Sequence, residues 1–216
     1  MIDFLVSGGP VMIPIGLASV IGLGAFIERL WALRRTHVIP HGVRVELVEL
    51  ARQGRWADGL TLCRKSDTPL SRVLEVVLSH RTQPRPVMKE LSEEVGRREG
   101  AELERYSGIV GVVAAVSPLL GLLGTVWGMI LTFDVIQSVG VGVVSSLAGG
   151  ISAALVTTFA GLSVGIPTLI AHRFLLSKVD DLVLELEEAT LEMLDLVVEA
   201  QAAGGIDGDT SGEAAK

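Results

Sequence analysis

Two apolar stretches of this chain carry hydroxyl groups that could form polar contacts between helices. Thr125 and Thr132 lie in one stretch, and Thr157 and Thr158 lie in the next. A hydroxyl can hydrogen-bond its own helix, so a single threonine carries little information. Four threonines in two neighbouring helices could instead line a polar seam. A hydroxyl does not bind and release a proton near neutral pH, but it can orient water or a carboxyl group.

Asp134 is the only Asp, Glu, Lys or Arg in residues 106–172. It follows Thr125 by nine residues, which is about 13 Å along a helix axis. Acidic side chains within a membrane are rare and often functional. Two interpretations therefore stay open for Asp134: an interfacial residue at the outer end of a span, and an acidic entry site for protons.

Small residues recur at three- and four-residue spacing in the same two stretches. They are Gly121, Gly124 and Gly128 in the first stretch, and Ala154, Gly161 and Gly165 in the second. This spacing lets helix backbones approach closely in lipid, where no hydrophobic force drives helix association. We therefore assign these six residues to helix packing.

The segment from Gly161 to Gly165 also matches the G-x-S-x-G pattern of serine hydrolases, with Ser163 as the nucleophile. That chemistry requires a sharp strand-to-helix turn, whereas this segment lies inside a continuous apolar stretch. An intramembrane serine hydrolase is thus less favoured than a channel or a structural membrane scaffold. His37 and His41 flank Pro40, which argues against a helical metal pair. We expect no catalytic residue, no cofactor and no metal.

The charges show where these stretches lie. All 18 Lys and Arg residues fall within 29–105 and 173–216, outside three long apolar stretches. About 20 apolar residues span a bilayer, and positively charged segments stay in the cytoplasm. The sequence therefore predicts an all-α integral membrane protein with three transmembrane helices. We also expect a helical cytoplasmic domain, long helices that extend into the cytoplasm, and membrane lipid as a partner.

The expected boundaries follow from the apolar runs and from the positions of Pro and Gly. They are an outer N-terminus at 1–9, spans at 10–31, 109–135 and 146–171, a cytoplasmic domain at 32–108, an outer loop at 136–145, a cytoplasmic helix at 172–200 and a disordered tail at 201–216. A long helix is expected to start after Pro86 and to continue into Ile109. Apolar residues at a period of 3.6 predict one buried stripe on the last helix: Val179, Leu182, Val183, Leu186, Leu194 and Val197.

Composition excludes two other classes. The formal net charge is −7 and aromatic residues make up 4% of the chain, and basic residues do not interleave with aromatic ones, so nucleic acid is not an expected partner. The single cysteine, Cys63, excludes an intrachain disulfide framework. We interpret it as a small buried apolar residue.

The runs from Pro118 to Ile130 and from Gly150 to Pro167 resemble the two signature segments of the ExbB/TolQ/MotA proton-channel family. The first span, from its start through Ile27 to Trp31, is similar as well, and the resemblance is closest to the ExbB/TolQ branch. MotA proteins usually carry four spans, whereas this chain has three. The order of parts agrees over nearly the whole chain.

The resemblance implies a homopentamer in the bacterial inner membrane, with a periplasmic N-terminus and a cytoplasmic C-terminus. It implies that two copies of a single-span ExbD- or TolR-like partner place their helices in the central pore. The partner carries an Asp that takes up and releases protons, and the proton motive force drives mechanical work at the cell envelope. By motif position, Thr125 and Thr158 correspond to pore-facing threonines of the family.

The machine that is powered stays open at this stage. TonB-linked uptake, a Tol system with a TonB- or TolA-like component, and gliding motility all fit, and the ion could be a proton or sodium. One residue departs from the family pattern, because ExbB and TolQ proteins often have a Glu where this chain has Ala153. Its absence moves the binding of protons onto the partner's Asp.

Overall fold

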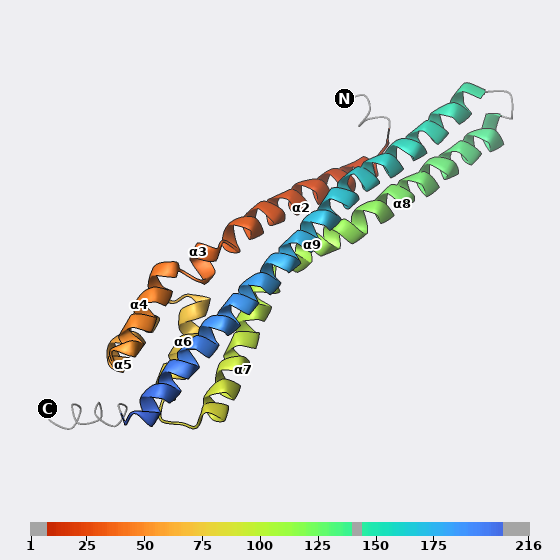
Figure 1. Cartoon of the computed structure of the whole chain (residues 1–216). Helices are drawn as coiled ribbons and strands as arrows, with labels where there is room; N and C mark the ends of the chain where they lie inside the picture. Colours follow the sequence, from red (N-terminus) through yellow and green to blue (C-terminus); the bar gives the residue numbers. More distant parts are fainter. Residues whose placement is uncertain (1–7, 140–143, 205–216) are drawn as a thin grey trace. The chain divides into compact units, whose positions relative to one another are not determined.

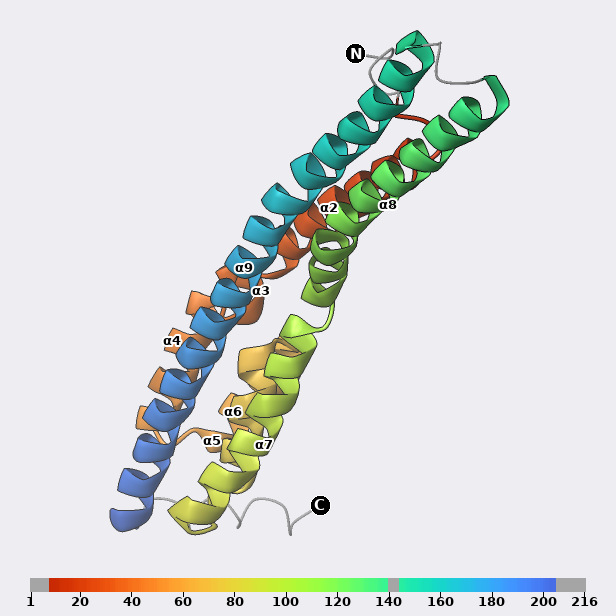
Figure 2. The same cartoon turned by 90° about the vertical axis from the view of Figure 1, so that its right-hand side faces the viewer.

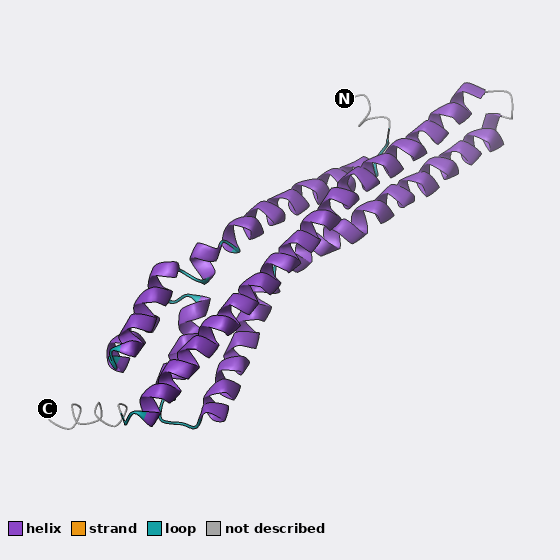
Figure 3. Ribbon diagram, viewed as in Figure 1, coloured by secondary structure: helices purple, strands orange, loops and turns teal. Residues whose placement is uncertain are grey.

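The structure, a computed structural model, describes residues 8–139 and 144–204. Every regular element in these two ranges is an α-helix (Figure 3). The helices are α2 (Met12–Ala32), α3 (Arg35–Val38), α4 (His41–Arg52), α5 (Trp56–Ser66), α6 (Pro69–Ser79), α7 (Arg85–Glu104), α8 (Ser107–Val139) and α9 (Val144–Ala202) (Figure 1). The all-α prediction is confirmed.

The chain divides into two compact units. The first, called the spanning unit here, comprises Met1–Leu30 and Tyr106–Leu176. The second, called the polar unit, comprises Trp31–Arg105 and Ser177–Lys216. Both are built on α9, whose N-terminal part belongs to the spanning unit and whose C-terminal part belongs to the polar unit.

The spanning unit consists of α2, α8 and the first part of α9. All three helices are long and apolar enough to cross a membrane, as predicted. Most of their large apolar side chains are exposed, among them Val20, Leu119 and Leu155. A helix that is apolar on all sides is stable when lipid surrounds it. In both Figure 1 and Figure 2, α8 and α9 run side by side as neighbouring helices of this unit.

Each of the two long spans contains a proline. Pro118 lies within α8 and Pro167 within α9. Proline removes one backbone donor from a helix, and membrane helices tolerate this when other groups satisfy the freed backbone. Beside Pro118, the Ser117 hydroxyl donates to the carbonyl of Val113 at 2.7 Å. Both helices continue through their prolines without a break.

The polar unit packs α4 to α7 against the C-terminal part of α9. Its most buried large side chains include Trp56, Leu74 and Met88, together with Met193 and Leu194 of α9. Five of the six residues of the predicted stripe on α9 are buried, and Val183 is half-buried. The 3.6-residue period therefore identified the packed side of this helix.

Local signals set the short helices of the polar unit. Asp67 ends α5 in the left-handed conformation, with φ of 41°. Thr68 then caps α6, because its Oγ1 accepts a hydrogen bond from the backbone N–H of Ser71 at 3.3 Å. Pro69 follows at the start of that helix, where a missing N–H costs least.

The single cysteine, Cys63, is buried in the polar unit. Its burial, and to a smaller extent the negative charge of Glu75, raises the pKa of its thiol to about 12.

Two predicted boundaries differ from the observed ones. The sequence predicted one helix from Pro86 into the second span, but α7 ends at Glu104 and α8 begins at Ser107. At this turn the Tyr106 ring stacks under the guanidinium of Arg29, 4.7 Å from the ring centroid. The predicted outer loop at 136–145 is also shorter, because α8 continues to Val139. Most of the tail predicted as disordered, residues 205–216, lies outside the described residues.

A buried carboxylate joins α6 to α7. Glu99 is 6% exposed and accepts two hydrogen bonds from Arg72, from Nε at 2.7 Å and from Nη2 at 2.6 Å. Arg72 Nη1 also donates to Asp67 Oδ1 at 2.9 Å. The Glu99 hydrogen bonds raise the pKa of the Arg72 guanidinium above its ordinary value.

We expect Glu99→Gln to lower the free energy of unfolding of the polar unit by about 2 kcal/mol, because it replaces a charged hydrogen-bond acceptor. The matched control is Glu94→Gln on the same helix. Glu94 is exposed and lies 4.0 Å from Arg98, so its loss should change the stability by less than about 0.5 kcal/mol. Denaturation followed by Trp56 fluorescence in a Trp31→Phe, Trp127→Phe background measures both. Equal effects of the two variants would contradict this assignment.

Candidate functional site

Small residues bring the backbones of α8 and α9 into contact in the spanning unit. A Cβ atom built on Gly161 would lie 2.6 Å from the carbonyl oxygen of Ser117 and 2.8 Å from Cα of Gly121. A Cβ on Gly121 would lie 3.0 Å from the carbonyl oxygen of Thr157. Backbone atoms cannot move aside as a flexible side chain can. Glycine at both positions is therefore required by the packing, and we call this contact the glycine seam.

The seam continues in both directions along the two helices. Toward the start of α8, Gly165 accommodates the ring of Pro118, since a Cβ there would lie 2.6 Å from Cγ of that proline. Toward the end of α8, a Cβ on Gly128 would lie 3.0 Å from the carbonyl oxygen of Gly150 and 3.1 Å from Cβ of Ala154. All six residues assigned to packing from the sequence lie along the glycine seam.

Two of the four predicted pore threonines are buried in this seam. Thr157 packs against Gly124, and Thr132 packs against Gly150. Their side chains are almost fully inaccessible. Each hydroxyl donates within its own helix, from Thr157 to the carbonyl of Ala154 at 2.8 Å and from Thr132 to that of Gly128 at 2.8 Å. These hydroxyls satisfy backbone carbonyls and serve packing in the spanning unit.

The other two threonines, Thr125 and Thr158, are only half-buried. The Thr125 hydroxyl donates to the carbonyl of Leu122 in its own helix at 2.6 Å. The Thr158 hydroxyl donates across the seam, to the carbonyl of Gly121, at 3.3 Å. Thr125 follows Gly121 by four residues, so the two threonines lie about one turn, or ~6 Å, apart along the helix pair.

Helix α2 packs on the side of the α8–α9 pair that faces away from Thr125 and Thr158. Val11, Met12 and Ile15 form a cluster with Leu120 of α8 and with Ala160 and Val164 of α9. Thr125 follows Leu120 by five residues, and Thr158 precedes Ala160 by two. At 100° per residue, each threonine lies about 120–160° around its helix from these residues that contact α2.

The side with Thr125 and Thr158 is called the open face here. The large side chains around the two hydroxyls are exposed; they are Leu122 and Met129 of α8, and Leu155 and Leu162 of α9. The open face thus presents two hydroxyl groups within an otherwise apolar surface. It carries no acidic residue, because residues 144–171 of α9 contain none and Asp134 of α8 points elsewhere.

Asp134 is exposed near the end of α8. Nine residues separate it from Thr125, which is two and a half helical turns and places it on the opposite side of the helix. The structure therefore does not bring Asp134 together with the two hydroxyls of the open face.

Ser163 lies in the middle of α9 with its side chain exposed, and no sharp turn surrounds it. His172 is nine residues further on, again two and a half turns, and so it lies on the other side of the helix. The geometry brings no base to this serine, and the G-x-S-x-G pattern here follows from the small-residue spacing of the glycine seam.

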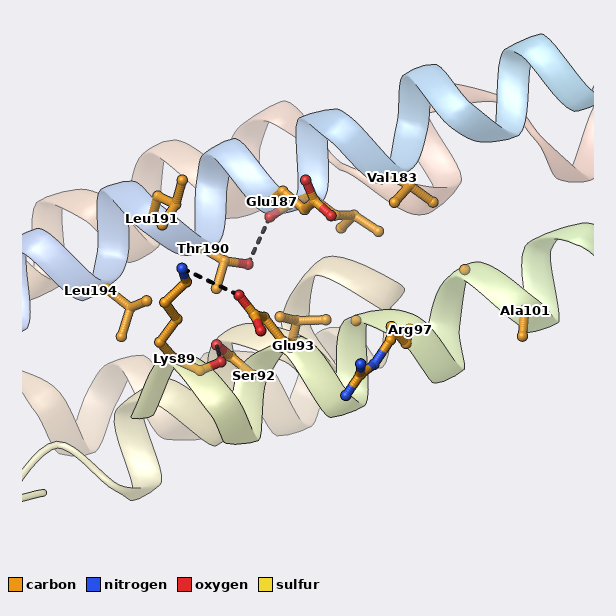
Figure 4. A pocket seen from close by; sticks show the side chains of 14 residues that line it. Lys89, Ser92, Glu93, Arg97, Ala101, Val183, Glu187, Thr190, Leu191 and Leu194 are labelled. Carbon is orange, nitrogen blue, oxygen red and sulfur yellow. Dashed lines mark hydrogen bonds and ion pairs between the residues drawn. The ribbon is translucent and has the colours of Figure 1, made fainter. Parts of the chain in front are cut away.

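The polar unit contains a separate groove of about 490 Å³ between α7 and α9 (Figure 4). Gly96, Gly100 and Ala101 line it from α7, and apolar residues such as Val183 and Leu194 line it from α9. At its edge, Lys89 pairs with Glu93 at 3.4 Å. The groove is mainly apolar, and this ion pair neutralises one of its carboxylates, so we locate the candidate site for proton movement on the open face instead.

The chain is similar to known proteins over most of its length. The model of the MotA/TolQ/ExbB proton channel family matches residues 65–188, which is more than half of the chain. The biopolymer transport protein ExbB-like 1 of Synechocystis sp. is 30% identical over 82% of this chain and 71% of its own length. ExbB-like 3 of the same organism is 30% identical over 76% of this chain and 79% of its own length.

The chain belongs to the MotA/TolQ/ExbB proton channel family. The biopolymer transport protein ExbB of Neisseria gonorrhoeae is a further relative, 30% identical over 55% of this chain and 60% of its own length. The family match covers all of α8 and the part of α9 that lines the glycine seam and the open face.

Membership of the MotA/TolQ/ExbB family gives a specific meaning to Ala153. It is the position where the resemblance described above implies a Glu in ExbB and TolQ proteins. Ala153 is half-buried, and its carbonyl lies 3.2 Å from the Thr157 hydroxyl. It precedes Thr158 by five residues, so it lies about 140° around α9 from that hydroxyl, away from the open face.

We expect Gly161→Ala to destabilise the spanning unit by roughly 1–3 kcal/mol, because the added methyl group meets backbone atoms on α8. Gly149→Ala on the same helix is the matched control, since a Cβ there has no neighbour within 4 Å. Alanine's higher helix propensity should leave the control unchanged or stabilise it by up to about 1 kcal/mol. Thermal unfolding in lipid nanodiscs measures both variants. If they shift the transition equally, the backbone contact is not what stabilises the pair.

Proposed function

We propose that this chain is the channel subunit of a motor driven by the proton motive force in the bacterial inner membrane. Five copies surround a pore that holds the helices of a dimeric single-span partner, similar to ExbD or TolR. The partner's Asp takes up and releases the proton, and the resulting motion performs work at the cell envelope. TonB-linked uptake, a Tol system and gliding motility are the candidate machines, with a TonB- or TolA-like component as the recipient of the work.

The observation that supports this proposal is the chemistry of the open face. Thr125 and Thr158 present hydroxyls to the surface of the α8–α9 pair that α2 does not cover. A hydroxyl can orient a carboxyl group but cannot itself carry a proton near neutral pH. A proton pathway along this face therefore requires an acid from another chain, and the family partner would supply one.

The charge distribution supports the proposed orientation. Lys and Arg are confined to residues 29–105 and 173–216, and such segments stay on the cytoplasmic side. We therefore place the N-terminus in the periplasm and the C-terminus in the cytoplasm. Arg29, at the end of α2, is paired with Glu28 at 2.7 Å, as suits the boundary between lipid and water.

A structural membrane scaffold is the second candidate function. It is favoured by Thr132 and Thr157, whose hydroxyls serve packing in the seam. A scaffold needs no exposed hydroxyls on the open face, so the two functions differ in what Thr158 should do. The chain is not proposed to be an enzyme, because Ser163 and His172 lie on opposite sides of α9.

Neighbouring threonines provide the decisive comparison. Thr158→Val should lower proton flux into liposomes by about tenfold or more, because a hydrogen bond to a charged carboxylate contributes about 1.5–3 kcal/mol. Thr157→Val should leave flux close to the wild-type value, because that hydroxyl only satisfies its own helix. The chain is co-reconstituted with the single-span protein that copurifies with it, and size-exclusion chromatography checks the assembly.

Each proposed function has its own outcome in this assay. A scaffold would give no partner-dependent flux, and both variants would then behave alike. Ser163→Ala tests the hydrolase hypothesis. A motor subunit should keep its flux in this variant, whereas a hydrolase that uses Ser163 should lose its activity. Wild-type flux that does not depend on the transmembrane potential would refute the motor.

Asp134→Asn should lower flux only partly, by about threefold or less, because the side chain lies on the opposite side of α8 from Thr125. At an outer entrance its charge would raise the local proton concentration without binding the transported proton, and this effect weakens with salt. The assay above, repeated at low and high ionic strength, checks this. Complete loss of flux would show that Asp134 belongs to the pathway itself.

A further inference from the structure

Two buried polar atoms in the spanning unit have no hydrogen-bond partner among the described residues. They are Oγ of Ser107, at the start of α8, and Nδ1 of His172, on α9. Ser107 is fully buried. Leaving a buried polar group unsatisfied costs about 1–3 kcal/mol. An unpaired buried group therefore indicates a bound water molecule or a functional role.

Both atoms belong to the same part of the α8–α9 pair. The His172 ring lies over Gly111, where a Cβ would be 2.9 Å from Nε2 and 3.0 Å from Cε1 of the imidazole. Ser107 precedes Gly111 by one helical turn, about 6 Å along the axis. The hydroxyl and the imidazole thus lie on facing helices within about one turn of each other, and a buried water molecule needs two or more such polar partners to be stable.

His172 lies further along α9 than the residues of the open face. It follows Thr158 by 14 residues, which is about four turns, so the two side chains lie on similar sides of α9, about 21 Å apart along the axis. The imidazole is the only side chain type whose ordinary pKa puts its charge change between about pH 5 and 8. No other histidine occurs in residues 81–216.

The charged groups near this end of the spanning unit are already engaged or exposed. Arg29 is buried, stacks on the Tyr106 ring and pairs with Glu28. Arg173 follows His172 in the chain and is exposed. The charges of Glu28 and Arg29 compensate each other.

We propose that His172, with a water molecule held by Ser107, is the proton acceptor at the inner end of the open face. This inference rests on the proposed function. A proton that reaches the shared water along the pathway passes to Nδ1 of the neutral imidazole and leaves the water neutral. The imidazolium then releases one proton to water on the cytoplasmic side, which restores the neutral imidazole. Ser107 positions the water and does not itself titrate, and no electron transfer is involved.

The experiment measures proton flux in liposomes that contain the full chain and its copurified partner, while the pH on the inner side is varied from 5 to 8. Flux through the wild type should depend on this pH. His172→Gln keeps a hydrogen-bonding amide but removes the titrating group, so flux should fall about tenfold and its dependence on inner pH should disappear. His80→Gln, at an exposed turn position of the polar unit, is the control and should match the wild type.

A second pair of variants keeps the imidazole and disturbs only its position. Gly111→Ala puts a methyl group against the ring and should shift the dependence on inner pH. Gly108→Ala, where a Cβ has no neighbour within 4 Å, should leave it unchanged. This pair decides the matter if His172→Gln fails to assemble. Ser107→Ala should slow flux but preserve the pH dependence.

The possible failures can be told apart. If the wild type conducts and both His172→Gln and Gly111→Ala retain its flux and pH response, the role of His172 is refuted while the proposed function stands. If the wild type and its partner conduct no protons, the proposed function and the inference fall together.

Discussion

Direct contact between the backbones of α8 and α9 is the constraint on which the spanning unit depends. At Gly121 and Gly161 no side chain separates the two helices. Lipid offers no hydrogen-bond partners to a helix, so the polar groups of the pair must be satisfied within the protein. The hydroxyls of Thr132 and Thr157, forced into the seam by this close approach, therefore donate to carbonyls of their own helices.

The same contact accommodates the proline of α8. Pro118 cannot donate to the carbonyl of Ala114, four residues earlier. Gly165 lies against both the proline ring and that carbonyl, since a Cβ on this glycine would be 3.4 Å from the Ala114 oxygen. The absence of a side chain at Gly165 thus leaves room for the ring and lets the second helix approach the freed carbonyl. A proline in one helix and a glycine in the other form one packing feature.

The sequence predicted the parts of the fold that depend on one helix at a time. Long apolar runs gave the three spans, and the 3.6-residue period gave the buried side of α9 from Val179 to Val197. The break between α7 and α8 could not be predicted, because residues 105–106 carry neither Gly nor Pro. There Tyr106 meets Arg29 from α2, a contact between residues far apart in the chain.

The candidate site was predictable in part. Thr157 and Thr158 each lie three or four residues from both Ala154 and Gly161, so the small-residue spacing places both near the seam and does not tell which of the two is buried. The sequence also predicts that Asp134 and Thr125 lie on opposite sides of α8, because nine residues make two and a half helical turns. The side that α2 covers depends on side-chain packing between helices, and so does the contact of the His172 ring with Gly111. Neither could be read from the periodicity of one helix.

The hydrogen bond of Thr158 links the packing of the seam to the proposed function. Its hydroxyl reaches the carbonyl of Gly121 at 3.3 Å, longer than the usual 2.5–3.0 Å for an O–H donor. That carbonyl also lies within a helix, where a backbone N–H is available to it. The hydroxyl can therefore leave Gly121 at little cost. A carboxylate that approaches the open face would offer a stronger, charge-assisted acceptor. Under the proposed function, protonation of the partner's carboxylate would remove this advantage and return Thr158 to Gly121. The strength of one hydrogen bond would then depend on whether the partner carries the proton, and this difference would couple protonation to movement.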